Sequence, residues 1–237
     1  MFKIDLHTHT IASGHAFGTI QENAREAKNK GIELLGISDH APTGSGAPSE
    51  AYFRVGKRLP KEIEGVRVLF GVEANIISDA GGLDLPEKIL ERLDFVMAGF
   101  HDCCFEDQGM ERNTEALVKA MQNPYVKIIS HPYVSKFVVD MERIALESIK
   151  SNVLLEINAS YFYKGQIVDE GIWNRMKKMV EVLKNNDQKI LVGSDAHTPW
   201  EVGKFEDVVS NLKELGIDES DLWNDDVEGM LAFLGKE

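Results

Sequence analysis

Short apolar runs recur along the chain and alternate with longer segments of a different periodicity. Each run holds four to six residues, many of them Val, Ile, Leu or Phe, which is the pattern of buried strands. We expect seven such strands, over residues 3–6, 33–37, 67–72, 95–98, 126–129, 153–157 and 189–192.

The segments between these runs are typical of helices. Thr19 stands three residues before Glu22, which is a capping box that begins a helix, and Gly31 follows as its end. We expect helices over 19–30, 49–58, 86–92, 111–122, 141–150 and 168–185, with two or three more after Trp200.

Strand and helix in regular alternation predict parallel strands joined by right-handed crossovers. The sequence contains no linker, low-complexity tract or internal repeat, so a single domain over residues 1–237 is expected. Two architectures fit: an open, doubly wound sheet, or a barrel of seven or eight βα units. An open sheet usually places its site in one crevice, whereas a barrel gathers residues from the C-terminal ends of nearly all its strands.

All seven histidines lie just past the C-terminal end of an expected strand, or in the loop that follows it. If each had about one chance in four of doing so, the joint probability would be on the order of 10⁻⁴. Two acids share this position, Glu73 after the third strand and Asp195 after the seventh. The candidate metal ligands are therefore His7, His9, His15, His40, Glu73, His101, His131, Asp195 and His197.

Nine ligands suit about three metal ions, because a catalytic zinc site uses about three protein ligands and keeps one position open. If Glu73 bridges two ions, about ten bonds form, and the few remaining positions are free for water and substrate. Asp5 shares a strand face with His7 and His9, so we expect it to accept a ring N–H and fix a tautomer. The alternative is a buried acid satisfied by backbone N–H groups.

The composition changes this picture little. Hydrophobic residues make up 43% and charged residues 27%, no apolar run approaches 18 residues, and the start lacks signal-peptide order. We therefore expect a cytoplasmic protein without a membrane partner. The net charge of −13 is unsuited to long nucleic acids, but bound cations would allow a small anionic substrate.

The only two cysteines are neighbours, Cys103 and Cys104. Bridging them would close a small strained ring, so a structural disulfide is not expected. We interpret the pair as two reduced thiols.

Taken together, these motifs resemble those of a known family. DLHTHT at residues 5–10, His15, SDH at 38–40, Glu73, His101, HP at 131–132 and GSDAH at 193–197 resemble the PHP (polymerase and histidinol phosphatase) superfamily. Length and spacing are most similar to its YcdX-like small bacterial phosphatases. The resemblance implies a distorted, TIM-like (β/α)7 barrel, with a trinuclear metal centre at the C-terminal ends of the strands. It also implies hydrolysis of a small phosphate ester, and it makes a homo-oligomer an option.

By carry-over from the family, His7, His9, Glu73 and Asp195 would hold one ion. Glu73 would bridge to a second ion held with His101 and His131, and His15, His40 and His197 would hold the third. Zinc is the expected metal, with manganese or iron as alternatives because this donor set accepts all three.

The expected chemistry needs no side-chain nucleophile. Water bridging two ions would become a hydroxide, and the ions would neutralise the phosphoryl oxygens. Lys136 lies five residues after His131 and is expected to bind phosphate. Asp39, beside His40, is expected either to protonate the leaving group or to accept a hydrogen bond.

Other functions share parts of this pattern. A histidinol-phosphate phosphatase or a nuclease acting on nucleotide ends would use the same centre. An amidohydrolase would explain His7, His9 and Asp195 but not His15, His40 or Glu73. A non-catalytic metal-binding module would predict missing ligands, and no ligand is missing.

Overall fold

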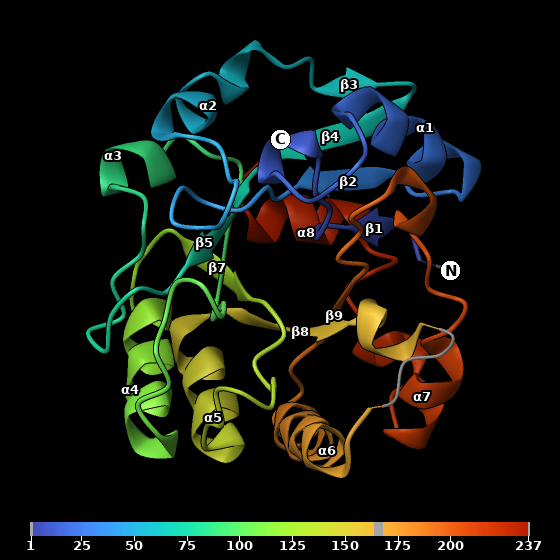
Figure 1. Ribbon diagram of the computed structural model, residues 1–237. Coiled ribbons are helices and arrows are strands. Elements are labelled where there is room, and N and C mark those ends of the chain that lie inside the picture. Colours follow the sequence, from blue (N-terminus) through green and yellow to red (C-terminus); the bar gives the residue numbers. More distant parts are fainter. Residues whose placement is uncertain (1, 164–167, 237) are drawn as a thin grey trace.

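The computed structural model describes residues 2–163 and 168–236 (Figure 1). The strands are β1 (Ile4–Asp5), β2 (Leu34–Ile37), β3 (Glu62–Ile63), β4 (Val66–Phe70), β5 (Val72–Asn75), β6 (Val96–Gly99), β7 (Val126–Ile129), β8 (Leu154–Asn158) and β9 (Leu191–Gly193). The α-helices are α1 (Ile20–Asn29), α2 (Glu50–Arg54), α3 (Glu87–Leu90), α4 (Met110–Met121), α5 (Met141–Ser151), α6 (Glu170–Asn185), α7 (Val209–Glu214) and α8 (Val227–Phe233). Short 3-10 helices are η1 (Ile11–Ser13), η2 (Gly56–Arg58), η3 (Ala159–Phe162), η4 (Pro199–Glu201) and η5 (Glu219–Asp221).

The expected strands and helices are present with small shifts at the ends, except at two places. The helix expected over 49–58 is the shorter α2, which ends at Arg54 and is followed by η2, and the third expected strand is divided. There the chain makes two strands, β4 and β5, separated by Gly71. β4 pairs with β2 and β5 pairs with β6, so the chain changes partners at this glycine. A Cβ at Gly71 would lie 2.5 Å from the Phe95 ring, so only glycine leaves room for the crossing. The short strand β3 was not expected either.

The strands form two sheets. One has the order β1-β2-β4-β3, with β3 antiparallel to β4, and the other is the parallel sheet β5-β6-β7-β8-β9. Isolated parallel bridges join Thr8 to Ala196 and His40 to Glu73, between the two sheets. The fold is therefore mixed α/β with parallel sheets. The hydrogen-bonded strands form two sheets and not one closed sheet, so the TIM-like (β/α)7 barrel stays a prediction. The single-domain organisation also stays a prediction.

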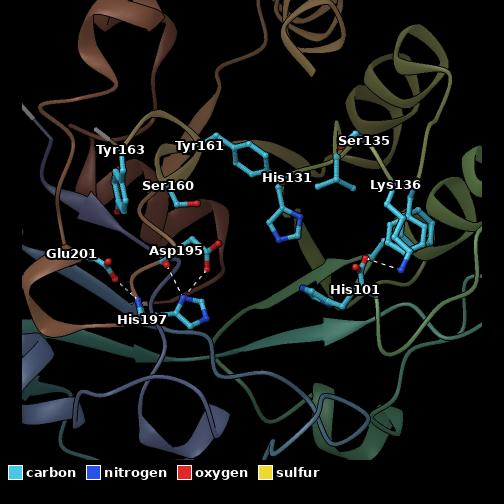
Figure 2. A pocket seen from close by; sticks show the side chains of 14 residues that line it. His101, His131, Ser135, Lys136, Ser160, Tyr161, Tyr163, Asp195, His197 and Glu201 are labelled. Carbon is cyan, nitrogen blue, oxygen red and sulfur yellow. Dashed lines mark hydrogen bonds and ion pairs between the residues drawn. The ribbon is translucent and has the colours of Figure 1, made fainter. Parts of the chain in front are cut away.

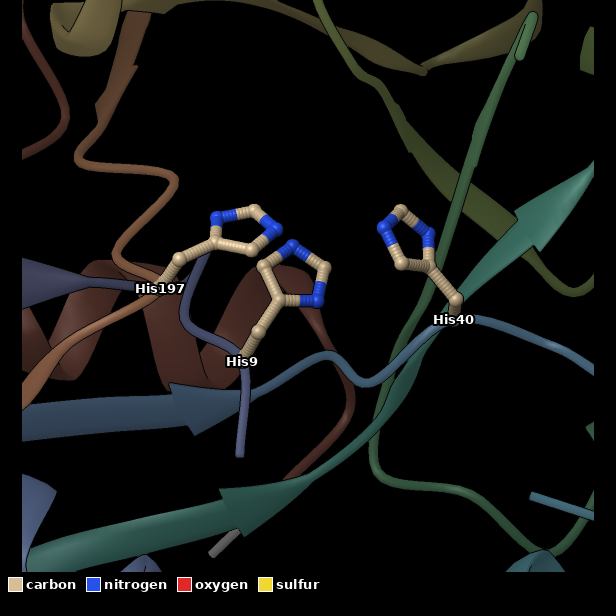
Figure 3. A group of neighbouring side chains, drawn as sticks. All are labelled: His9, His40 and His197. Atoms are coloured by element: carbon tan, nitrogen blue, oxygen red, sulfur yellow. The ribbon is translucent and has the colours of Figure 1, made fainter. Parts of the chain in front are cut away.

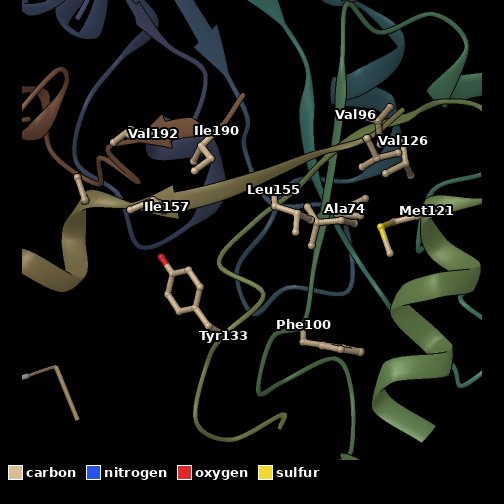
Figure 4. Packing of buried hydrophobic residues seen from close by; sticks show 14 of the residues in the cluster. Ala74, Val96, Phe100, Met121, Val126, Tyr133, Leu155, Ile157, Ile190 and Val192 are labelled. Atoms are coloured by element: carbon tan, nitrogen blue, oxygen red, sulfur yellow. The ribbon is translucent and has the colours of Figure 1, made fainter. Parts of the chain in front are cut away.

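Two apolar clusters hold the strands in place. The larger lies between the strands and the surrounding helices, and Figure 4 shows part of it, with Val96 and Val126 together and Met121 of α4 beside them. In Figure 1, α4, α5 and α6 stand side by side over the second sheet. The smaller cluster, here called the inner core, combines residues of both sheets with α8. Its members are Ile4, Leu6, Leu34, Leu69, Phe95, Met97, Ile128, Leu154, Leu191, Met230, Leu231 and Leu234.

None of the helices in the described part of the chain has the length and apolar character needed to cross a membrane. The capping box expected at Thr19 is present, because its hydroxyl accepts from Glu22 N and its own N–H donates to Glu22. This local sequence signal therefore predicted the start of α1 correctly.

The inner core makes the C-terminal helix a stability determinant. Met230 is fully buried, so Met230→Ala should lower the free energy of unfolding by about 2–5 kcal/mol through lost burial and a cavity. Urea denaturation followed by circular dichroism measures this. The exposed neighbour Glu228→Ala is the control and should change stability by less than about 0.5 kcal/mol. Equal midpoints for the two variants would contradict the inner-core role of α8.

Candidate active site

The nine expected ligands come together at the ends of the strands. His7 and His9 follow β1, His40 follows β2, and Glu73 lies in β5. His101 and His131 follow β6 and β7, and Asp195 and His197 follow β9. We call the space bounded by these side chains and His15 the histidine basin. Residues that are far apart in sequence meet there because parallel strands point their C-terminal ends to one side.

Glu73 lies at the centre of the basin and is fully buried. Its Oε1 lies 3.0 Å from His131 Nε2 and 3.2 Å from His101 Nε2. Its Oε2 lies 3.3 Å from His7 Nε2, 3.5 Å from His9 Nε2 and 3.1 Å from His40 Nδ1. The two oxygens of one carboxylate thus face two separate sets of imidazoles, which is the geometry of a bridging ligand.

Asp195 closes the basin on the β9 side. Its Oδ1 lies 3.1 Å from His9 Nε2 and 3.3 Å from His7 Nε2, while Asn158 Nδ2 donates to its Oδ2 at 3.0 Å. Asp195 and His131 have positive φ angles, 54° and 29°. Such conformations cost on the order of 1–3 kcal/mol each for residues other than glycine and gather at functional sites.

A third group of imidazoles lies on the outer side of the basin. Figure 3 shows His9, His40 and His197 reaching toward one another from three segments, and their ligand atoms lie within 4.8 Å of one another. His15 joins them, because its Nε2 lies 3.0 Å from His197 Nε2 and its ring centroid 5.1 Å from that of His40. His15 is the most exposed of these rings.

Several buried nitrogen and oxygen atoms of the basin, all of them able to bind a metal, have no hydrogen-bond partner among the described residues. They are Nε2 of His7 and His9, Nδ1 of His40 and His131, both ring nitrogens of His101, and Oε2 of Glu73. Most of these nitrogens lie 3.1–3.5 Å from an oxygen of the Glu73 carboxylate without an aligned hydrogen bond, whereas buried polar groups usually make one. Imidazole nitrogens and carboxylate oxygens around one space are a donor set for divalent cations, and the basin fits them.

Glu156 of β8 belongs to this site but was not predicted. It is fully buried, its Oε1 lies 2.7 Å from His7 Nδ1, and its Oε2 accepts from the backbone N–H of His131 at 3.1 Å. A Cβ at Gly193 would lie 2.0 Å from Glu156 Oε1, so the glycine makes room for this carboxylate. The available signal was an acid inside an apolar run, LLEIN at residues 154–158.

The expected role of Asp5 needs correction. Its carboxylate accepts backbone N–H groups, from Ser194 at 3.1 Å, Gly203 at 2.8 Å and His7 at 3.3 Å. The acceptor for the His7 ring is Glu156 instead. Asp5 therefore ties the end of β1 to the segment after β9, because its side chain reaches backbone N–H groups across that junction.

Asp39 is fully buried behind the basin. Its two oxygens accept from Thr10 N at 2.7 Å, Thr10 Oγ1 at 2.8 Å, Ser13 Oγ at 2.7 Å and the Tyr52 hydroxyl at 2.6 Å. Ser13 Oγ lies 3.2 Å from His9 Nδ1, which links Asp39 to a ligand ring. Of the two roles expected for Asp39, this geometry supports the hydrogen-bond acceptor and leaves no free oxygen to protonate a leaving group.

A pocket of about 600 Å³ opens beside the basin, and Lys136 lines it. Figure 2 shows Lys136 on one side and Tyr163 on the other, with His131 and Asp195 between them. The Lys136 amine lies 3.2 Å from Asp102 Oδ1 and 5.5 Å from the centre of the Phe137 ring. Lys136 therefore lines the same pocket as the ligands His101, His131, Asp195 and His197, and its side chain is half exposed.

The buried charges shift the pKa values of the basin residues. Burial favours neutral Glu73, but the positive charges of the imidazoles, that of His7 foremost, hold its pKa well below the ordinary value. Burial opposes protonation of His7, but the carboxylates, Glu156 foremost, raise its pKa well above the ordinary value. Burial and the charge of His9 lower the pKa of His40 well below its ordinary value.

Comparisons with known proteins find relatives over nearly the whole chain. The family model of the PHP domain matches residues 5–187. A probable phosphatase of Thermoanaerobacter sp. (strain X514) is 44% identical over 232 residues, which cover 98% of this chain and 94% of that protein. A probable phosphatase of Acetivibrio thermocellus is 41% identical over 236 residues, 100% of this chain and 96% of that protein.

One solved structure shares the fold across nearly the whole chain. It is the histidinol phosphate phosphatase of Lactococcus lactis, crystallised with zinc, L-histidinol and phosphate. The TM-score is 0.63 at 17% identity, and the match covers 91% of this chain and 94% of that one. At this level of identity the likeness concerns the fold.

Glu156 should set the pKa of His7 in the metal-free protein. Glu156→Gln keeps the volume but removes the charge, so the His7 pKa should fall. Because the pKa of His7 is higher in the folded than in the unfolded protein, protonated His7 stabilises the fold at low pH. This stabilisation disappears as the pH rises through the folded pKa, and in the variant it should disappear at a lower pH. NMR titration of the imidazole signals measures this. The exposed Glu142→Gln is the control, and an unchanged His7 pKa in Glu156→Gln would contradict the assignment.

Proposed function

The chain belongs to the PHP domain family, and from that premise we propose that it is a metal-dependent phosphatase that hydrolyses small phosphate monoesters. The observation that carries the proposal is the set of unpaired, buried donor atoms around Glu73. The relatives named probable phosphatases support the reaction type.

Three ions would share the basin. His7, His9, Glu73 and Asp195 would hold the first, and Glu73 with His101 and His131 the second. His15, His40 and His197 would hold the third. The split contacts of the Glu73 oxygens and the 3.0 Å approach of His15 to His197 support this division. We propose zinc, which the Lactococcus lactis enzyme of this fold holds, with manganese or iron as alternatives.

The bound ions would supply positive charge to the phosphoryl oxygens and to the attacking water. The surrounding residues hold the ligands in place. Glu156 fixes the orientation of the His7 ring, and Asp39 fixes that of His9 through Ser13. Both carboxylates are buried and hydrogen-bonded, Glu156 to the His7 ring itself and Asp39 to the serine that contacts His9.

The pocket beside the basin would receive the substrate. Lys136 would bind a phosphate oxygen in place of its present partner Asp102, and Phe137 and Tyr161 would contact the alcohol portion and exclude water. A volume of about 600 Å³ suits a small molecule. We expect neither long nucleic acids nor membranes as partners, because the chain carries a net charge of −13.

We also infer that the two sheets close into the expected distorted barrel. The bridges at Thr8–Ala196 and His40–Glu73 and the inner core shared by both sheets support closure. Histidinol phosphate or a nucleotide end would fit the same centre. An amidohydrolase is less well supported, because His15, His40 and Glu73 also line the basin.

Removing the central ligand tests the proposal. Glu73→Gln keeps the side-chain volume but should lower kcat for an aryl phosphomonoester more than about a hundredfold, because two ions would lose their shared anionic ligand. Circular dichroism should show a retained fold, and His9→Ala should behave in the same way. Glu142→Gln, on the exposed face of α5, should keep wild-type activity. Full activity in Glu73→Gln would exclude the proposed centre.

Lys136 is tested by separating KM from kcat. Lys136→Ala should raise KM for the phosphomonoester about tenfold or more with a smaller change in kcat, because a charge-assisted bond to phosphate is lost. Lys136→Arg should recover most of the affinity, and Lys119→Ala on α4 serves as the control. An unchanged KM in Lys136→Ala would leave the residue as an ordinary surface cation.

A further inference from the structure

The two cysteines of the chain touch each other. The Sγ atoms of Cys103 and Cys104 lie 3.2 Å apart. Cys103 is exposed and Cys104 is partly exposed. The proposed hydrolysis uses neither thiol, so this contact is a feature that the phosphatase chemistry does not explain.

The pair lies at the mouth of the proposed active site. Both cysteines line a cavity of about 550 Å³ that has Asp102 and Lys136 in common with the substrate pocket. His101 lies two residues before Cys103, and its Nε2 lies 3.2 Å from Glu73 Oε1. A chemical change at the thiols would therefore take place two and three residues after a basin residue.

The backbone connects the thiols to His101 directly. The N–H groups of Cys104 and Phe105 both donate to the carbonyl oxygen of His101, at 2.9 and 3.1 Å. Phe105 is buried and its ring centroid lies 4.5 Å from that of Phe100, which anchors the far end of the turn. With both ends anchored, any change in the 103–104 backbone must be absorbed within this turn.

We propose that Cys103 and Cys104 form a reversible oxidation site whose disulfide lowers the activity of the neighbouring centre. Hydrogen peroxide would oxidise the exposed Cys103 thiol to a sulfenic acid and release one water. The Cys104 thiol would then attack the sulfenic sulfur, form the S–S bond and expel a second water. The dithiol loses two electrons and two protons, which the peroxide takes up.

The bridge cannot form without moving the backbone. Neighbouring Cα atoms are about 3.8 Å apart across a trans peptide, less than the roughly 4.4–6.8 Å usual for disulfides. The torsions of residues 103 and 104 must change, which weakens the bonds to the His101 carbonyl and the Asp102–Lys136 pair. Because the bridge departs from ordinary geometry, thiols should reduce it easily.

The test treats the metal-loaded protein with hydrogen peroxide, removes the excess with catalase, and follows free thiols, intact mass and phosphomonoester hydrolysis. Both thiols should disappear, with a mass loss of two hydrogen atoms. The effect on activity rests on the proposed function. Hydrolysis should fall about tenfold, because the bridge disturbs the turn that supports the ligand His101. Dithiothreitol should restore the thiols and the activity.

Cys103→Ser and Cys104→Ser are matched controls, since each keeps the turn but removes the bridge. Both should keep their activity after peroxide. An equal loss of activity in these variants would assign the effect to oxidation elsewhere and overturn the proposal. Two results with the unmodified sequence would also overturn it: a gain of oxygen without a disulfide, or a disulfide that leaves hydrolysis unchanged. A protein inactive before and after treatment would contradict the proposed phosphatase, while thiol count and mass would still decide whether the bridge forms.

Discussion

One buried carboxylate organises the site. Glu73 is fully enclosed and has five imidazole nitrogens within 3.0–3.5 Å of its two oxygens. A buried anion is tolerated only when opposite charge or hydrogen bonds compensate its lost hydration. The imidazoles supply part of that compensation in the metal-free protein, and cations between them would supply the rest. The charges of these imidazoles, that of His7 foremost, hold the pKa of Glu73 well below its ordinary value.

Three further buried acids support the basin from behind, each in a different way. Glu156 holds the His7 ring, Asp39 reaches His9 through Ser13, and Asp5 joins the ends of β1 and β9 through backbone N–H groups. None of the three needs to meet substrate. Their hydrogen bonds restrict how far the ligand rings can move, which is what precise metal binding requires.

Much of this site could be predicted from the sequence, because a residue just past a parallel strand has little choice about which end of the fold it occupies. Strand position therefore identified the nine basin residues and the place of Lys136. Position does not determine which hydrogen-bond partner a side chain finds, since that depends on neighbouring strands. For this reason the partner of the His7 ring is Glu156, which was not predicted, and Asp5 accepts backbone N–H groups instead. The break at Gly71 was missed because it depends on the Phe95 ring, which comes from a distant segment.

The most direct test of the account is metal analysis of protein purified without added metal, paired in the same preparation with hydrolysis of an aryl phosphomonoester. The donor set around Glu73 predicts about three divalent ions per chain and phosphate release that stops when the ions are removed and returns when they are restored. One ion or fewer, with no phosphate released after addition of zinc or manganese, would contradict the central claim that the histidine basin is a multinuclear phosphatase centre.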